Sequence, residues 1–118
     1  MTETEKLVAK IVEALQEKKG RNIITMNLTE IQGSICQYFV ICEGGSPTQI
    51  SALSDSVWDM VATDIKEKPL GAVGMREAQW IAMDYGTVMV HIFMPELRSY
   101  YNLENLWADA LIEEFNQE

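Results

Sequence analysis

The residue types that could do chemistry first come together in a glycine-rich stretch, Glu43-Gly44-Gly45-Ser46-Pro47, at the predicted start of a helix. Backbone N–H groups at a helix N-terminus can hold a phosphate or another anion. The stretch lacks the Lys-Ser/Thr pair of a Walker loop, and its two glycines do not form the G-x-G-x-x-G pattern that binds dinucleotides. We therefore interpret it as a tight turn followed by a helix cap, with an anion site as the alternative.

Two carboxylates follow this turn. A Gly-Ser turn on a mixed sheet is also found in nucleotidyltransferases, which need two carboxylates on a strand about ten residues later to hold the catalytic metal ions. Asp55 and Asp59 follow Ser46, but the helical period places both on the solvent side of the predicted helix. The sequence therefore predicts no catalytic residue, no metal ligand and no cofactor here. A nucleotidyltransferase-like phosphoryl-transfer enzyme is kept as the alternative function.

The single histidine, His91, could act as a general base or a metal ligand. It lies between apolar residues on a predicted strand, with no second histidine and no cysteine nearby in the sequence. We interpret it as a structural histidine with one ring nitrogen hydrogen-bonded. The alternative is that it supports tyrosine or aspartate side chains beside an interface.

A predicted β-hairpin carries the most distinctive surface. One face would take Trp80, Ala82 and Asp84, and the opposite face would take Ile81, Met83 and Tyr85. A large aromatic residue and a charge on either side of a small residue are typical of interface hot spots. Trp80 as a simple core residue is an equally weighted alternative. The segment after the hairpin adds Tyr100, Tyr101 and Trp107, and its acidic side, which includes Glu104, is most simply a solvated face.

The charge balance limits the kind of partner. The chain has 118 residues, of which nine are basic and eighteen acidic, for a net charge of −9. Such a chain has no large positive field for a phosphate backbone, so we expect little direct nucleic-acid binding. The same balance favours encounter with a basic protein. We expect one domain over residues 1–118. The sequence shows no signal peptide and no membrane span, and Cys36 and Cys42 are interpreted as reduced packing residues. A cytoplasmic protein is expected.

Hydrophobic periodicity predicts the elements that position these residues. A first helix begins with a capping box between Thr2 and Glu5 and ends with Gly20 at its C′ position. A second begins at Ser46, with Gln49 completing a capping box, and a last amphipathic helix begins at Asn102 and continues through Phe115. Strands and shorter elements are predicted at residues 22–26, 38–42, 80–84 and 87–94, with a short edge strand and loop within 72–78 and a helical turn at 95–100.

This order predicts an α/β or α+β domain with a mixed β-sheet flanked by helices. The strands at 38–42 and 87–94 are apolar on both faces, so we expect both in the middle of the sheet.

Several of these motifs resemble the ribosomal silencing factor family, also called Iojap-like proteins, over about residues 7 to 110. The first carriers are Lys18-Lys19 with Asn22-Ile23-Ile24, Tyr38-Phe39-Val40-Ile41, and Gly44-x-Ser46 leading into Gln49, Ala52 and Asp55. The most specific are Trp80-Ile81-x-x-Asp84-Tyr85-Gly86, Val90-His91-x-Phe93 and Arg98-x-Tyr100-Tyr101-x-Leu103-Glu104-x-Leu106-Trp107. The sequence departs from the family pattern at Asn22, Gln37, Gln49, Ser51 and Val73.

The resemblance implies a nucleotidyltransferase-like fold that lacks the catalytic carboxylates, and a protein that is not an enzyme. Members of the family bind the large ribosomal subunit through the ribosomal protein numbered fourteen, which is basic. They sterically prevent the small subunit from joining and so repress translation when nutrients are short. A part in large-subunit biogenesis is described for organellar relatives, and free members are often homodimers.

On this basis we expect a translational repressor that docks its hairpin on a basic ribosomal protein. Trp80 would be the desolvated anchor, and Asp84 would pair with a lysine or arginine of the partner. Tyr85 and Gly86 would let the hairpin tip lie flat on that surface. The expected partner-binding set is Trp80, Asp84, Tyr85, Gly86, His91, Tyr100 and Glu104.

Overall fold

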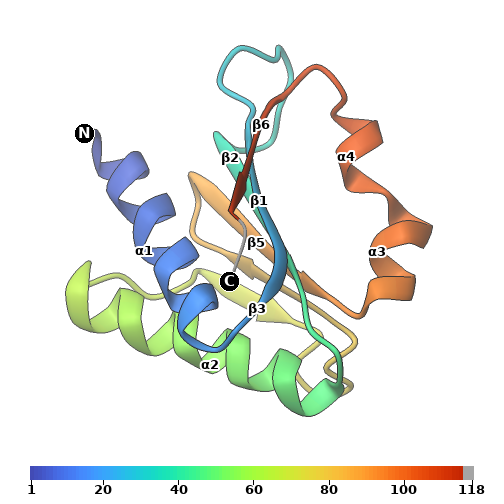
Figure 1. Cartoon of the computed structure of the whole chain (residues 1–118). Coiled ribbons are helices and arrows are strands. Elements are labelled where there is room, and N and C mark those ends of the chain that lie inside the picture. Colours follow the sequence, from blue (N-terminus) through green and yellow to red (C-terminus); the bar gives the residue numbers. More distant parts are fainter. Residues whose placement is uncertain (116–118) are drawn as a thin grey trace.

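Six strands form one mixed sheet in the order β3-β4-β5-β2-β1-β6 (Figure 1), in a computed structural model that describes residues 1–115. The strands are β1 (Arg21–Asn27), β2 (Tyr38–Glu43), β3 (Gly71–Val73), β4 (Trp80–Asp84), β5 (Val88–Phe93) and β6 (Leu111–Phe115). The helices are α1 (Glu3–Glu17), α2 (Pro47–Asp64), α3 (Pro95–Tyr101) and α4 (Leu103–Leu106). The predicted mixed sheet with flanking helices is confirmed.

The two predicted central strands, β2 and β5, do lie in the middle of the sheet. They pair in parallel, with Val40 beside Val90 and Ile41 beside His91, whereas every other neighbouring pair in the sheet is antiparallel. Both strands are buried on both faces, which is why their sequences are apolar throughout. The short edge strand expected within residues 72–78 is β3, displaced by one residue.

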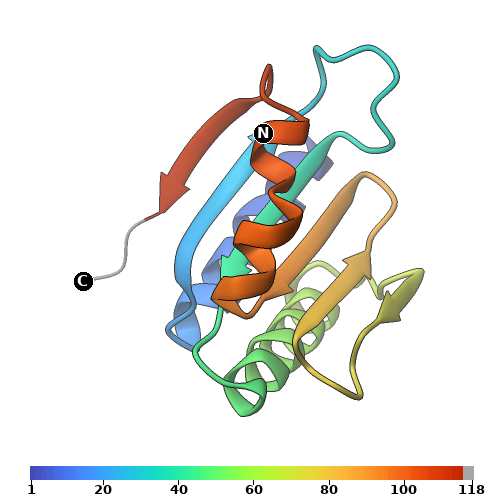
Figure 2. The ribbon, with the colours of Figure 1, turned by 90° about the vertical axis from the view of Figure 1, so that its right-hand side faces the viewer.

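Helices cover the two faces of the sheet unequally. On one face, α1 and α2 pack over the larger core, which includes Leu7, Leu15, Ile50, Leu53, Val90 and Ile92. On the other face, α3 and α4 lie across β5, β2 and β1 (Figure 2), over a smaller core that includes Ile24, Met26, Phe39, Ile41 and Phe93. As Figure 2 shows, β3 and β4 extend beyond these two short helices on that face.

The predicted capping box at the start of α1 is confirmed, since the side chains of Thr2 and Glu5 each bond the other's backbone N–H. The end of α1 differs by one residue from the prediction. Lys19 adopts the left-handed conformation, with φ of 60°, and Gly20 follows it. Gly20 is needed for space rather than for φ, because a Cβ there would lie 2.4 Å from the sulfur of Cys42.

The N-terminus of α2 is capped by Ser46 as predicted, because its hydroxyl accepts the N–H of Gln49 at 3.1 Å. The second half of the predicted capping box is different. The Gln49 amide oxygen accepts the N–H of Gly45 at 2.7 Å, and its NH2 group donates to the carbonyl of Lys19 at 3.1 Å. Gln49 therefore ties the start of α2 to the end of α1.

The predicted last helix, from Asn102 to Phe115, is wrong. Helix α4 has one turn, and residues 111–115 form β6, which pairs antiparallel with β1. Asn102, at φ of 48°, ends α3 and begins α4, a conformation that asparagine tolerates better than most residues. The apolar residues from Leu103 to Phe115 fit a helical stripe, but pairing with the edge of β1 decides the conformation of the last five.

Both cysteines, Cys36 and Cys42, are free and buried, as predicted. Within residues 1–115, no helix has the length and apolar content that crossing a membrane requires.

Candidate functional site

A strip of β3 and β4 lies beside α3 on the less covered face of the sheet. Val73 pairs with Ala82, and in an antiparallel pair such partners share a face. Trp80 and Asp84 lie two residues to either side of Ala82 and so point the same way. All three β4 residues are partly exposed, and Val73 is 67% exposed. We call Val73, Trp80, Ala82 and Asp84 the hairpin strip.

Trp80 joins this strip to the end of α3. Its ring stacks on Phe93, with ring centroids 4.9 Å apart, and lies 4.5 Å from the ring of Tyr101. Tyr101 in turn makes an edge contact with Tyr100, which is 78% exposed. Trp80 is therefore neither a simple core residue nor a free surface residue. It is the second of four members in an aromatic row that runs from Phe93 in the core to Tyr100 at the surface.

His91 lies under Trp80 and fixes its orientation. The indole N–H of Trp80 donates to Nδ1 of His91 at 3.1 Å, which confirms the expected structural histidine with one bonded ring nitrogen. Burial lowers the pKa of His91 to about 4, so the ring is neutral at physiological pH and carries its proton on Nε2. Nε2 is buried and has no hydrogen-bond partner among the described residues.

The tip of the hairpin contains the remaining residues predicted on β4 and its turn. The Asp84 carboxylate accepts the N–H of Gly86 at 2.7 Å through one oxygen. Gly86 is exposed and has a φ of 84°, which favours glycine at this turn. Tyr85 points to the other face and is buried against the core under α1 and α2, where burial raises its pKa to about 12. Its ring therefore does not contribute to the exposed surface of the hairpin strip.

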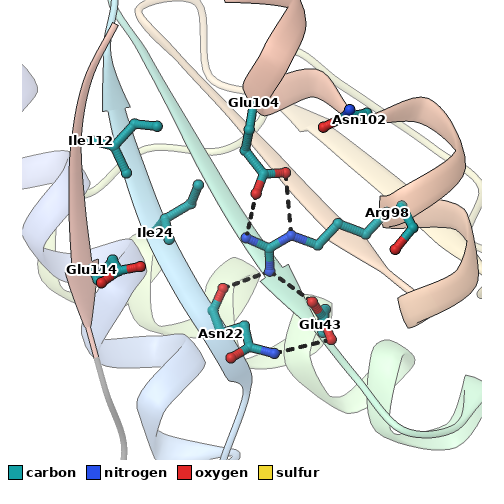
Figure 3. A pocket seen from close by; sticks show the side chains of 9 residues that line it. Asn22, Ile24, Glu43, Arg98, Asn102, Glu104, Ile112 and Glu114 are labelled. Carbon is teal, nitrogen blue, oxygen red and sulfur yellow. Dashed lines mark hydrogen bonds and ion pairs between the residues drawn. The ribbon is translucent and has the colours of Figure 1, made fainter. Parts of the chain in front are cut away.

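Glu104 belongs to a partly buried ion-pair network centred on Arg98 (Figure 3). The Arg98 guanidinium binds both carboxylate oxygens of Glu104, at 3.3 and 3.2 Å, and donates to Glu43 at 3.0 Å. It also donates to the backbone carbonyl of Asn22 at 2.6 Å, and the Asn22 side chain donates to Glu43 at 3.3 Å. This network holds α3 and α4 on the ends of β1 and β2.

The structure thus separates the predicted site residues into three groups, apart from Tyr85, which is buried on the opposite face of the sheet. Trp80, His91 and Tyr100 are connected at the end of β4 next to α3, and Asp84 and Gly86 lie at the hairpin tip. Glu104 is tied to Arg98 rather than solvated on its own. Sequence reasoning missed Arg98 and Glu43 as partners. Their contact crosses 55 residues, and the only signal was a charged residue at the end of an apolar strand.

The glycine-rich loop is already bonded within the protein. The N–H of Gly44 donates to the carbonyl of Phe93 at 3.0 Å, and the N–H groups of Gly45 and Gln49 donate to the side chains of Gln49 and Ser46. These N–H groups would otherwise be available to an anion. Asp55 and Asp59 are exposed on α2, as predicted, rather than on a strand. No group of three or more His, Cys, Asp or Glu residues within positions 1–115 could hold a metal ion.

Comparison with known proteins identifies the family. A family model described as "Ribosomal silencing factor during starvation" matches residues 1–118. The chain is 37% identical to the ribosomal silencing factor of Bacillus subtilis over 98 residues, which is 82% of this chain and 80% of that protein. It is 34% identical to the ribosomal silencing factor of Halalkalibacterium halodurans over 106 residues, covering 90% of this chain and 89% of that protein.

The fold agrees with this match. The crystal structure of a protein from Chromobacterium violaceum is similar to this chain with a TM-score of 0.82 and 29% identity, covering 97% of this chain and 88% of that one. The resemblance seen in the sequence motifs is confirmed over most of the chain, and the chain belongs to the ribosomal silencing factor family.

Proposed function

We propose that this chain is a translational repressor that binds the large ribosomal subunit through the basic ribosomal protein numbered fourteen. A bound domain of this size at the subunit interface would prevent the small subunit from joining, without making or breaking a covalent bond. Membership of the ribosomal silencing factor family supports a role in regulating translation on the ribosome. A part in large-subunit biogenesis belongs to the same proposal, as does a cytoplasmic location.

The observation that carries the proposal is the exposed hairpin strip. Val73, Ala82 and the edge of Trp80 present apolar surface that α3 and α4 leave uncovered, and Asp84 lies at one end of it. A compact apolar centre with a charged rim is the composition of a protein-binding surface. The net charge of −9 favours a basic partner.

Each residue of the expected partner-binding set has a role in this proposal. Trp80 is the anchor, because His91, Phe93 and Tyr101 already hold its ring and little side-chain entropy is lost on binding. Asp84 uses one oxygen for the hairpin turn and offers the other to a lysine or arginine. Gly86 keeps the tip low, and Tyr85 fixes the tip to the core from the opposite face.

The other members act from α3 and α4. Tyr100 extends the aromatic row and forms the rim of the surface. Glu104 acts indirectly, since its pairing with Arg98 holds α3, and with it Tyr101, in place. The free protein is also proposed to be capable of forming a homodimer.

The test is co-sedimentation with isolated large and small subunits across a salt series. We expect binding to the large subunit alone, weakening as salt is added. Trp80→Ala should reduce affinity by about thirty- to a thousand-fold, the range for a buried anchor worth about 2–4 kcal/mol. Asp84→Lys should also reduce affinity, because a lysine repels the basic partner. Asp84→Asn keeps an oxygen for the Gly86 N–H and removes only the charge.

Matched controls lie on α2. Trp58 is 37% exposed and Asp59 is exposed there, outside the hairpin strip. Trp58→Ala and Asp59→Lys make the same chemical changes and should leave binding unchanged. If Trp80→Ala and Asp84→Lys both bind the large subunit as tightly as the parent, the hairpin strip is not the docking surface. ATP or GTP turnover with Mg²⁺ that is abolished by Asp55→Asn would contradict the non-enzymatic role.

A further inference from the structure

The other edge of the sheet is formed by β6, which has a neighbouring strand on one side only among residues 1–115. β6 pairs with β1 and is the last strand in the sheet order. In an edge strand, alternate residues direct their backbone N–H and C=O groups away from the sheet, where another strand can bond them. Figure 2 shows β6 at the opposite margin from β3 and β4, so this edge is separate from the hairpin strip.

β6 lacks three of the features that protect edge strands, and its two glutamates are the charges that keep it from pairing with another acidic strand. Its sequence, Leu111-Ile112-Glu113-Glu114-Phe115, contains no proline, no lysine and no bulge in its register with β1. Leu111 is 69% exposed and Ile112 is 47% exposed, although both are apolar residues on a regular strand. Exposed apolar side chains beside a free backbone edge are the properties of a strand-addition site.

The two glutamates on β6 favour pairing with a strand that carries basic residues. Glu113 and Glu114 point to opposite faces of the sheet, and neither forms an ion pair or a hydrogen bond with any residue in the described part of the chain. An added strand would therefore meet a carboxylate on each of its faces. Opposite charges across a strand pair are favourable, and like charges are not.

Hollows on both sides of β6 leave room for long side chains. On the face under α3 and α4, a hollow of about 430 Å³ is lined by Ile112, Glu114, Glu43, Glu104 and Arg98, with more acidic than basic side chains (Figure 3). On the other face, a hollow of about 500 Å³ between α1 and the β1–β6 pair is lined by Glu113, Phe115 and Glu5, among others. Lysine and arginine side chains could extend their charged ends into these acidic surroundings.

We propose that the β6 edge binds an extended, basic segment of a partner protein, which adds to the sheet as a seventh strand. In an antiparallel arrangement, which is the slightly more stable one, the residues opposite Glu114 and Glu113 are basic and those opposite Ile112 and Leu111 are apolar. The recognised segment therefore reads basic-basic-apolar-apolar from its N-terminus.

A second copy of this chain is a poorer occupant of the same edge. Pairing two β6 strands would bring two carboxylates from each copy into one short ladder, with no basic residue on either strand. Like charges across a strand pair oppose the association. A basic segment has no such conflict.

The test uses the peptide fluorescein-Thr-Val-Lys-Arg-Val-Ile-Thr-amide, which carries the dye on its N-terminal amine so that both basic side chains keep their charge, and fluorescence anisotropy with the full chain. We expect saturable binding, with amide shifts on β6 in nuclear magnetic resonance spectra. Glu113→Lys with Glu114→Lys should weaken binding by about tenfold or more. The matched control, Glu67→Lys with Glu77→Lys, changes the net charge equally at exposed positions away from β6 and should weaken it by less than about twofold.

Two further arms separate strand addition from simple charge attraction and from the hairpin strip. Two versions of the peptide, each N-methylated on one of its two alternating sets of residues, keep their charges, and only the version whose methyl groups face β6 should fail to bind. Trp80→Ala should leave peptide affinity unchanged, so failure at the hairpin strip and failure at β6 are distinguishable. Circular dichroism confirms folding of each variant, and Glu113→Gln with Glu114→Gln gives a milder version of the same change.

Four results would overturn the inference: no saturable binding of the peptide, equal binding of both N-methylated peptides, an equal loss in the control variant, or a dimer that forms through β6. The last result would assign the edge to a second copy of the chain.

Discussion

Acidification should destabilise the folded protein through His91. Burial holds the pKa of this side chain at about 4, against about 6.5 when it is exposed to water. Below about pH 6.5 the unfolded chain therefore binds a proton that the folded protein does not. Protonation in the folded state would also turn Nδ1 into a donor facing the Trp80 N–H, which now donates to it at 3.1 Å. The free energy of unfolding must fall as the pH falls through this range.

The two pKa values set the size of the effect. Each pH unit between them costs about 1.4 kcal/mol. Lowering the pH from about 7.5 to about 5.5 should therefore reduce the contribution of His91 to the free energy of unfolding by about 1.3 kcal/mol. The loss would continue to about pH 4 and then level off. The lower half of this range approaches the isoelectric point of about 4.5, where association is favoured, so the measurement belongs above it.

The assay is urea denaturation across this pH range for the parent and for His91→Asn. Asparagine places a side-chain oxygen near the position of Nδ1, so it can still accept the Trp80 N–H, but it does not titrate. Carboxylates titrate in both proteins, and the difference between the two stability curves isolates His91. Since the chain has one histidine, the two carbon-bound protons of its ring give one pair of signals whose titration is read directly. A difference between parent and variant that stays constant from about pH 7.5 to about 5.5 would refute the reasoning.

Two other predictions concern the scaffold. Arg98→Met leaves the carboxylates of Glu43 and Glu104 and the Asn22 carbonyl without their buried partner, so urea denaturation should show a loss of about 3–5 kcal/mol; a loss below about 1 kcal/mol would mean that the network is open to water. Gly20→Ala places a methyl group 2.4 Å from the Cys42 sulfur, so the free energy of unfolding in the same assay should fall by about 1–3 kcal/mol. Adding Cys42→Ala should recover part of that loss. If the effects of the two substitutions simply add, the contact does not exist.

The parts of the fold that sequence could predict are those fixed by neighbours along the chain. The alternation of Trp80, Ala82 and Asp84 against Ile81 and Met83 is a local pattern, and the hairpin follows it. The start of α1 was equally clear, because both halves of its capping box lie within four residues. The central position of β2 and β5 followed from their unbroken apolar runs.

The parts that were missed depend on contacts between distant residues. Residues 111–115 fit a helical stripe in the sequence, but in the structure they pair with the edge of β1, which lies near the other end of the chain. Gln49 has the spacing of a capping box, yet its side chain is drawn to the end of α1. Glu104 has the appearance of a solvated acid in the sequence. Its partner Arg98 lies only six residues away, but Arg98 is also held by Glu43, which lies 55 residues from Arg98 in the sequence. No local sequence pattern indicates which distant residue each of these side chains or strands will contact.

The parallel contact between β2 and β5 has a consequence for the order in which the molecule folds. The β1–β2 and β4–β5 pairs connect strands close in sequence, so each can begin to form early. The sheet becomes continuous only when residues 44–87 have closed into a loop that brings Val40 beside Val90. Closing that loop costs chain entropy before any seam contact is gained. Pairing of β2 with β5 is thus the step that fixes the native topology. Val40 and Val90, which meet at this pair, are small, rigid and fully buried, and they favour it.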